Sequence, residues 1–273
     1  MTMNYFKTLE TILLTKSPLE KIELFNNFYQ MYKNNELVFE ECSPAIELKE
    51  PSYFPFCTSV PPQDVPKRKN LTAVDGQINL IHAVAHIEYS AIDLALDSAY
   101  RFSGLPRAYY DDWLSVASDE IRHFMMLEKL LQDLGSTYGT VIVHDALFEA
   151  GQKTINLVER MAVVPRYLEA NGLDATPMIL KKLKKLPSSK GVDKIIDVLS
   201  TILEEEVDHV KKGDVWFSFV CEKEGLSTDI FFDIISKYYP RSFLRPNDLN
   251  IEARKKAGFS CKELNFMSKK EVC

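Results

Sequence analysis

The sequence predicts an all-α protein whose core is a four-helix bundle. Apolar residues recur at steps of three and four along four long tracts, which is typical of amphipathic helices. Glycine and proline punctuate the joins between the tracts, and no run of residues alternates as a half-buried strand does. The tracts extend over residues 75–102, 109–134, 147–170 and 192–221.

The first 70 residues form an expected extension ahead of the bundle. Helical spacing covers residues 5–16 and 18–34, and Pro18 suits the first turn of the second helix. Six prolines then cluster between residues 43 and 69, which indicates an extended connector lying over the surface of the main domain. We therefore divide the chain into an N-terminal extension of residues 1–70, a bundle of residues 71–225 and a C-terminal extension of residues 226–273.

Further short helices are expected outside the four tracts. One is a basic helix within the connection of residues 171–191, and two lie near residues 227–238 and 250–262. The lysines of the basic helix are compatible with an RNA-binding surface. They lack interleaved aromatic residues, which favours a solvated helix instead, and both interpretations stay open. These lysines are Lys181, Lys182, Lys184 and Lys185.

Composition narrows the class of protein. The formal net charge of −6 creates no overall attraction to nucleic acid or to an anionic membrane. The first residues lack the basic and apolar segments of a secretory signal, and no apolar stretch approaches the roughly 18 residues of a membrane span. The cysteines are odd in number and scattered, so neither a disulfide framework nor a thiolate zinc site is indicated: Cys42, Cys57, Cys221, Cys261 and Cys273. We expect a cytoplasmic protein with no membrane association.

Two of the tracts carry a glutamate and a histidine three residues apart on the apolar stripe. In the second tract Glu120 and His123 are flanked by apolar residues at helical spacing, and in the fourth tract Glu206 and His209 are placed in the same way. With 22 Glu and 5 His among 273 residues, chance gives roughly 0.4 such matches. Two matches, each on an apolar stripe, therefore favour a shared role over a pair of surface contacts.

The other two tracts each offer a glutamate at an inward position. Glu88 shares a stripe with apolar residues of the first tract, and Glu169 shares one with Ile155 and Pro165 of the third. Glu159, at the edge of that stripe, and Glu149, two turns or more earlier, compete with Glu169 for the same role.

The resulting order is Glu, Glu-x-x-His, Glu, Glu-x-x-His, with one element per helix. This is the ligand set of bundles that hold two metal ions between carboxylates. Four carboxylates offset the charge of two divalent ions of iron, manganese or both, and two imidazoles complete the coordination. Without metal, buried carboxylates would repel one another. The predicted metal ligands are Glu88, Glu120, His123, Glu169, Glu206 and His209.

Three further residues near these positions have alternative interpretations. His82 and His86 lie on the first tract, but His86 is about 200° around the helix from Glu88, so both cannot face one centre. Packing against the proline-rich connector is the alternative to a supporting role beside the metal ligands. Arg166, one turn before Glu169, is suited either to hold a ligand carboxylate or to form a surface salt bridge.

Several segments together resemble a known family. The stretches "PPQDVPKRK", "LIHAVAHIEYSAIDLALDSAYRF", "SDEIRHF", "VPRYLEANGLD" and "EEEVDHVKKGDVWF" follow the order found in a bacterial ferritin-like family classed as domain of unknown function family 455, within the ferritin-like di-iron carboxylate superfamily. The resemblance covers most of the chain. It implies the bundle fold and the same six metal ligands, and it supplies no established reaction.

The leading functional hypothesis is an oxidoreductase that uses a dinuclear centre, di-iron or iron–manganese, to activate dioxygen, for example as a hydroxylase. Its expected partners are an organic substrate and an electron donor. The alternative is a ferroxidase or metal-handling protein without an organic substrate, and a third hypothesis is a scaffold with a structural metal. Because the extensions would complicate packing of a shell, we expect a monomer or dimer rather than a ferritin cage.

Overall fold

The computed structural model of the chain describes residues 3–40, 44–67 and 69–273, so Cys42 lies outside the described residues. Helices dominate, which confirms the all-α prediction. The described residues also hold one pair of two-residue strands, β1 (Met3–Asn4) and β2 (Leu37–Val38), which pair in parallel. These strands are too short to leave an alternating pattern in the sequence. The chain forms two compact units, Met1–Gln152 and Lys153–Cys273.

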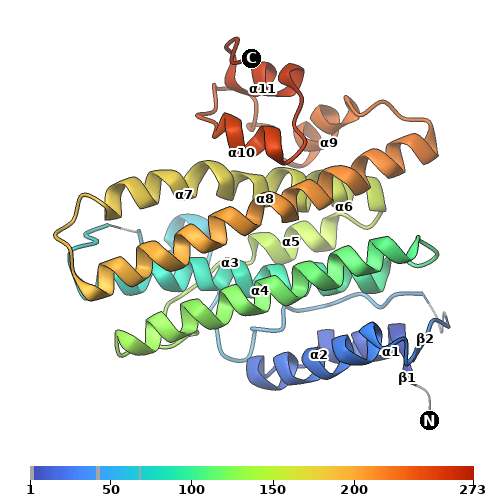
Figure 1. Cartoon of the computed structure of the whole chain (residues 1–273), viewed down its shortest axis with the longest axis horizontal. Coiled ribbons are helices and arrows are strands. Elements are labelled where there is room, and N and C mark those ends of the chain that lie inside the picture. The colour runs from blue at the N-terminus through green and yellow to red at the C-terminus, as the bar shows by residue number, and fades with distance from the viewer. Residues whose placement is uncertain (1–2, 41–43, 68) are drawn as a thin grey trace. The chain divides into compact units, whose positions relative to one another are not determined.

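The first unit begins with two helices whose starts are capped by side chains. In α1 (Tyr5–Leu14) the side chain of Asn4 accepts a hydrogen bond from Lys7 N, and in α2 (Pro18–Lys33) that of Ser17 accepts from Glu20 N. Pro18 occupies the first turn, as predicted. The two helices lie side by side in Figure 1.

The described residues of the proline-rich connector, 44–67 and 69–73, include one short 3₁₀ turn, η1 (Pro62–Asp64). The middle of the connector is anchored on the unit by Tyr53, whose hydroxyl donates to Asp145 at 2.9 Å, and by Ser52, whose hydroxyl donates to Asp93 at 2.6 Å. The connector is therefore packed against the first unit.

The core of the first unit is the pair formed by α3 (Val74–Arg101) and α4 (Arg107–Asp133), which run side by side (Figure 1). Both helices begin and end within two residues of the predicted bounds. The apolar stripes predicted for them are buried, including Ile81 and Ala85 on α3 and Trp113 and Leu127 on α4. Burial of these stripes turns one face of each helix toward the other. The carboxylates and the imidazole on those stripes are buried with them.

The tract expected as one helix over residues 147–170 is broken instead. It comprises α5 (Ala146–Lys153), α6 (Leu157–Val163) and a π-helical turn, η2 (Val164–Glu169). The break has a local cause, because the side chain of Asn156 accepts a hydrogen bond from Glu159 N and starts a new helix there. Ile155, which the sequence analysis placed on the buried stripe, is 72% exposed.

The third tract also ends later than residue 170, where the sequence places its end, although Gly172 follows two residues on. The helix continues through it as α7 (Ala170–Leu183), so the expected short basic helix is the end of α7. The following helix, α8 (Lys190–Glu224), ends at Gly225 in a left-handed conformation with φ 67°. In the second unit α8 packs against α6, η2 and α7.

The second unit ends with α9 (Ile230–Tyr238), α10 (Ile251–Lys256) and α11 (Cys261–Ser268). A disulfide joins Cys261 to Cys273, a pairing that the sequence analysis did not anticipate because the two cysteines lie 12 residues apart without a motif. Cys57 and Cys221 are free and buried.

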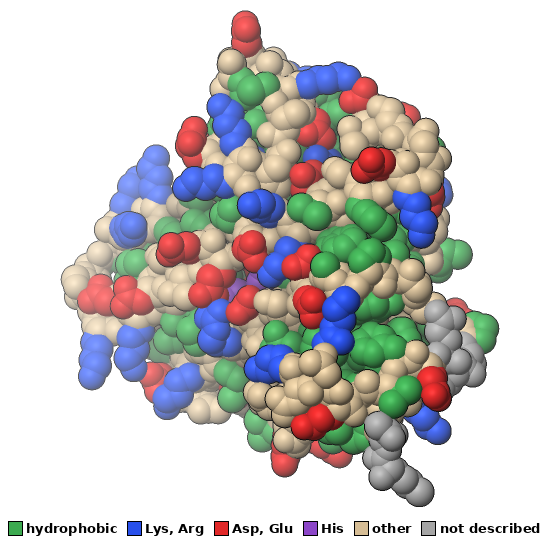
Figure 2. All heavy atoms as spheres, turned by 45° about the vertical axis from the view of Figure 1, so that its right-hand side comes forward, with side chains coloured by type: hydrophobic (Ala, Val, Ile, Leu, Met, Phe, Trp, Pro, Cys, Tyr) green, Lys and Arg blue, Asp and Glu red, His purple; other side chains and the backbone are tan. Residues whose placement is uncertain are grey.

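Two surface properties bear on function. Acidic and basic side chains are both spread over the face shown in Figure 2, in keeping with the modest net charge of −6. Among the described residues, no helix combines the length and the apolarity that a membrane crossing requires.

Candidate metal centre

The first group of predicted ligands lies between α3 and α4 of the first unit. Glu88 of α3 and Glu120 and His123 of α4 are all buried, with exposed fractions of 4%, 1% and 0%. Each offers one ligand atom, and these atoms lie within 4.8 Å of one another. The sequence analysis predicted all three as ligands, and the packing of α3 on α4 brings them together.

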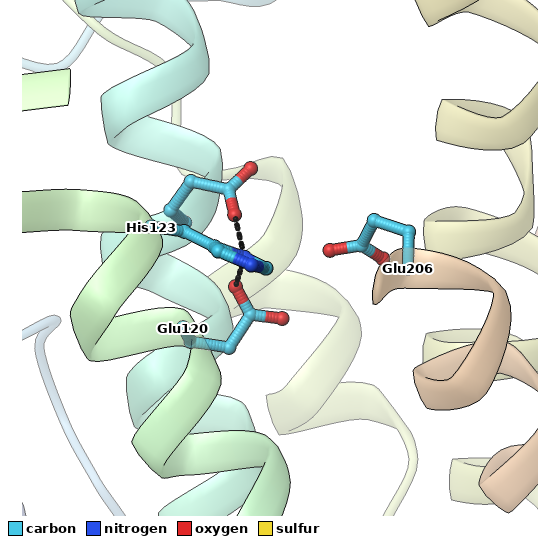
Figure 3. A group of neighbouring side chains, drawn as sticks. Glu120, His123 and Glu206 are labelled. Carbon is cyan, nitrogen blue, oxygen red and sulfur yellow. Dashed lines mark hydrogen bonds and ion pairs between the residues drawn. The ribbon is translucent and has the colours of Figure 1, made fainter. Parts of the chain in front are cut away.

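The imidazole of His123 lies between the two carboxylates. Its Nδ1 is 3.1 Å from an oxygen of Glu88 and 3.6 Å from an oxygen of Glu120. Figure 3 shows the Glu120 carboxylate and the His123 ring turned toward each other on α4. When Nδ1 is protonated, its proton therefore lies between two carboxylates. The imidazole and both carboxylates are side chains of the kinds that bind metal ions.

The two carboxylates favour the protonated form of His123. Burial alone lowers the pKa of His123, but hydrogen bonds and attraction from Glu120 and Glu88 overcome it and raise the pKa to about 11. Protonated His123 supplies one positive charge against two carboxylates. A cation among these side chains would lower the energy of the buried carboxylates.

A second group of predicted ligands lies on α8 of the second unit. Glu206 and His209 are one helical turn apart, and His209 Nδ1 is 3.4 Å from an oxygen of Glu206. His209 is fully buried, whereas Glu206 is half-buried. The same stripe holds Ile202 and Trp216, both buried, which matches the pattern predicted for this helix.

Glu169 ends the π-helical turn η2, which packs against α8. Pro165 lies within this turn and has no N–H to donate to a preceding carbonyl, which favours the wider π geometry. Its ring meets α8 at Gly213, where any Cβ would overlap the ring. This glycine lets η2 approach the stretch of α8 that carries His209. The half-buried side chain of Glu169 is thus held on an element in contact with the Glu206–His209 helix.

The two competing glutamates of the third tract have other surroundings. The carboxylate of Glu159 accepts hydrogen bonds from Lys237 at 2.6 Å and from Tyr238 at 2.8 Å. Burial opposes ionisation, but these hydrogen bonds lower the pKa of Glu159. Glu149 is exposed on α5, in the first unit. Both placements favour Glu169 as the ligand from this tract.

His82 and His86 bind a loop rather than the carboxylates. His82 Nε2 accepts hydrogen bonds from Gly139 N at 2.8 Å and from Val141 N at 3.3 Å. His86 has the hydroxyl of Tyr138 at 2.8 Å from Nδ1 and the carbonyl of His144 at 2.9 Å from Nε2. Burial lowers the pKa of each to about 4, so both are neutral at pH 7. Both histidines therefore have a packing role rather than a role beside the metal ligands. Their main partner is this loop and not the proline-rich connector.

Arg166 forms a buried ion-pair network instead of a surface salt bridge. Its guanidinium donates to Asp214 at 2.6 Å and to Glu263 at 2.8 Å. It thereby ties the π-helical turn to α8 and α11, all within the second unit. The basic cluster of Lys181, Lys182, Lys184 and Lys185 is exposed at the end of α7, which leaves both interpretations of it open.

A buried lysine was missed by the sequence analysis. Lys21 of α2 is fully buried and forms an ion pair with Asp93 of α3. It shares a stripe at steps of four, three and four with Phe25, Phe28 and Tyr32, all buried, whereas the apolar Leu19 of the same helix is 70% exposed. The criterion that identified the glutamates was a charged residue at helical spacing on an apolar stripe. The same criterion would have identified Lys21 as a buried residue.

Comparisons with known proteins place the chain in a family. A family model described as "Protein of unknown function (DUF455)" matches residues 14–265. A protein of Haemophilus influenzae, described as "Uncharacterized protein", is 36% identical over 275 residues, which cover 96% of this chain and 93% of that protein. No solved structure gives a significant match. The matched segment includes both groups of predicted ligands.

Proposed function

This chain belongs to the DUF455 family of proteins of unknown function, and we propose that it is a dinuclear metal protein of the ferritin-like carboxylate type that activates dioxygen. The observation that carries the proposal is the position of the His123 Nδ1 atom between two buried carboxylates, 3.1 Å from an oxygen of Glu88 and 3.6 Å from an oxygen of Glu120. An imidazole and two carboxylates are groups that bind divalent iron or manganese.

The number of predicted metal ligands in the chain is that of a site for two ions rather than one. The proposal takes α3, α4, the α6–η2–α7 segment and α8 as the four helices of a bundle, and each of them carries predicted ligands. This gives four carboxylates and two imidazoles, a complete ligand set for a dinuclear carboxylate site. Four negative charges would balance two divalent ions.

Bound metal would supply open coordination positions for dioxygen and the electrons to reduce it. The protein residues have separate tasks. Glu88 and Glu120 provide anionic oxygens, and His123 becomes a ligand through Nδ1 only after that nitrogen releases its proton. Buried apolar neighbours on α4, such as Ala117 and Phe124, keep water away from these groups. A dry site of this kind would suit the oxidation of an organic substrate, as in hydroxylation.

The test is metal loading followed by oxygen exposure. Metal-depleted protein is titrated anaerobically with ferrous iron or manganese, bound metal is counted by elemental analysis, and oxygen uptake is then recorded. We expect about two ions per chain. The Glu120→Ala, Glu206→Ala double variant should lose both ions, whereas Glu204→Ala, an exposed position on α8, should keep them. Equal binding by the double variant, or no binding by the wild type, would refute the proposal.

The same experiment separates the oxygenase hypothesis from metal handling. A ferroxidase would oxidise successive additions of ferrous iron and release or accumulate the product. An oxygenase would stop after its own metal is oxidised, until an electron donor reduces it again. Size-exclusion chromatography adds an independent criterion, because a storage protein forms a large shell whereas we expect a monomer or dimer.

A further inference from the structure

The first unit contains a cavity of about 380 Å³ that the metal proposal does not use. Its walls come from the end of α1, the connector over residues 47–53, the middle of α3 and the end of α5, all in the same unit. Small-molecule sites in proteins have volumes of roughly 300–1,000 Å³ and combine apolar walls with a few polar groups. The cavity is therefore large enough for a small organic ligand.

The cavity lies on the face of α3 opposite to the metal ligand Glu88. Ser90, Asp93, Leu94 and Asp97 line it and share one face of the helix. At 100° per residue, Asp97 is about 180° around the helix from Glu88, nine residues earlier. A ligand in the cavity would thus meet a different side of α3, and its binding does not depend on metal.

Apolar side chains from four segments form much of the wall. Leu13 of α1, Tyr53 of the connector and Leu94 of α3 are buried, and Phe148 of α5 is half-buried. Apolar surface gains free energy when it leaves water, so contact between this wall and an apolar ligand is favourable. A ligand for the cavity therefore has an apolar body.

The two acids that α3 contributes to the wall are each paired with a basic side chain. Both oxygens of Asp97 accept hydrogen bonds from Arg101, at 2.7 Å and 3.0 Å. Asp93 forms an ion pair with the fully buried Lys21 and accepts a hydrogen bond from Ser52 at 2.6 Å. Neither carboxylate therefore presents an uncompensated charge to the cavity.

The other charged side chains of the wall balance one another. Lys16 and Glu50 pair at 3.0 Å, and Glu47 and Lys49 add one exposed charge of each sign. Water and salt screen such exposed charges. A charged ligand would lose its hydration in the cavity without meeting a net charge of opposite sign, which costs free energy. The wall therefore favours a neutral ligand.

One neutral polar side chain of the wall has hydrogen-bonding groups to offer. The hydroxyls of Ser52, Tyr53 and Ser90 already donate to other groups of the protein. Gln152, at the end of α5, lines the cavity, and its side-chain amide forms no hydrogen bond with the residues that the structure describes. An amide offers two N–H donors and one carbonyl acceptor. Gln152 can therefore bind a hydroxyl or an amide of a ligand.

We propose that this cavity binds a neutral small molecule with an apolar body and a hydroxyl or amide group, which forms a hydrogen bond with Gln152. Amines and carboxylic acids of the same size are charged at pH 7. The cavity discriminates against both, because each would have to leave water without a counter-charge of its own.

The experiment compares three probes that share one apolar body and differ in charge. Isothermal titration calorimetry on the full chain at pH 7 uses 4-phenylbutan-1-ol, 4-phenylbutylamine and 4-phenylbutyrate. We expect the alcohol to bind with a Kd below about 1 mM and at least about tenfold more tightly than either charged probe. A charged probe that binds as tightly as the alcohol, or no binding of the alcohol at millimolar concentration, would overturn the proposal.

A first variant locates the binding in this cavity. Leu14 lines the cavity yet is 48% exposed, so Leu14→Trp can fold while it fills the mouth, and it should weaken binding of the alcohol about tenfold or more. Leu19→Trp, at a 70% exposed position on α2 outside the cavity, is the matched control and should bind as the wild type does. Unchanged binding in Leu14→Trp would refute the assignment.

A second variant tests the hydrogen bond. Gln152→Leu keeps an apolar side chain of similar length but removes the amide, and it should weaken binding of the alcohol about threefold to tenfold. Gln30→Leu, at an exposed position on α2, should leave the affinity unchanged. Equal affinities of Gln152→Leu and the wild type would show that the polar group of the ligand binds elsewhere, contrary to the proposal.

Discussion

Gly213 of α8 lies so close to the ring of Pro165 in η2 that a Cβ at position 213 would overlap the ring. Gly213 is four residues after His209, and Pro165 is four residues before Glu169, so the contact lies one turn from each of these two predicted ligands. The closeness of the two backbones at this point sets the distance between η2 and α8. A larger residue at position 213 must push the two elements apart.

Gly213→Ala should therefore destabilise the protein although alanine is the better helix former. Overpacking of a close contact costs about 1–3 kcal/mol, which exceeds the gain of up to about 1 kcal/mol from replacing a helical glycine. Urea unfolding measures the difference. The control is Gly172→Ala on α7, where a Cβ meets nothing within 4 Å, and it should be neutral or stabilising. A stabilised Gly213→Ala variant would show that the contact is not restrictive.

The three long helices with unbroken stripes were the most predictable part of the fold. α3, α4 and α8 each begin and end within three residues of the predicted bounds, because a stripe sustained over seven or more turns leaves little freedom in the register. The Glu–His pairs on α4 and α8 are local to one helix and were therefore visible in the sequence.

The third tract was predicted less well, because periodicity assumes a regular α-helix. The helix start at Asn156 and the π-helical turn at Val164–Glu169 both change which residues share a face, and neither changes the apolar composition. The contact of His123 with Glu88 joins residues on different helices and needed the packing of α3 on α4. Lys21 was overlooked because lysine is ordinarily exposed.

Metal should stabilise the protein, and the effect should depend on Glu88. A ligand at 100 times its dissociation constant adds about 2.7 kcal/mol if it binds only the folded state. We expect ferrous iron or manganese to raise the melting temperature of the metal-depleted wild type and a chelator to reverse the change. Glu88→Gln should show a much smaller rise, because it removes one of two carboxylates that flank His123. Glu23→Gln, at an exposed position on α2, should respond as the wild type does.

The buried network around Arg166 should be needed for the second unit to fold fully. Glu263→Ala removes one of two carboxylates that hold the guanidinium, and Arg166 is only 2% exposed. Breaking a buried ion pair costs about 3–5 kcal/mol, and we expect the low end because Asp214 remains. Hydrogen exchange should become faster in α10 and α11. Glu252→Ala, an exposed glutamate on α10, should change neither stability nor exchange, and similar behaviour of the two variants would contradict the network's importance.

His82 should make the protein less stable as the pH falls below about 6.5. Burial, followed by repulsion from His86, lowers the pKa of His82 to about 4 in the folded state, whereas an unfolded chain has a histidine pKa of about 6.5. Between these values the unfolded chain binds the proton and the folded chain does not, so stability is lost as the pH falls through this window. Each unit of pKa difference corresponds to about 1.4 kcal/mol, which gives about 3 kcal/mol in all.

His82→Gln keeps an acceptor for Gly139 N and Val141 N but does not titrate. In urea unfolding of metal-free protein at pH 7 and pH 5, this variant should lose clearly less stability than the wild type, since His86 titrates in both proteins and cancels in the comparison. Equal losses in the two proteins would mean that His82 takes up its proton without unfolding the chain.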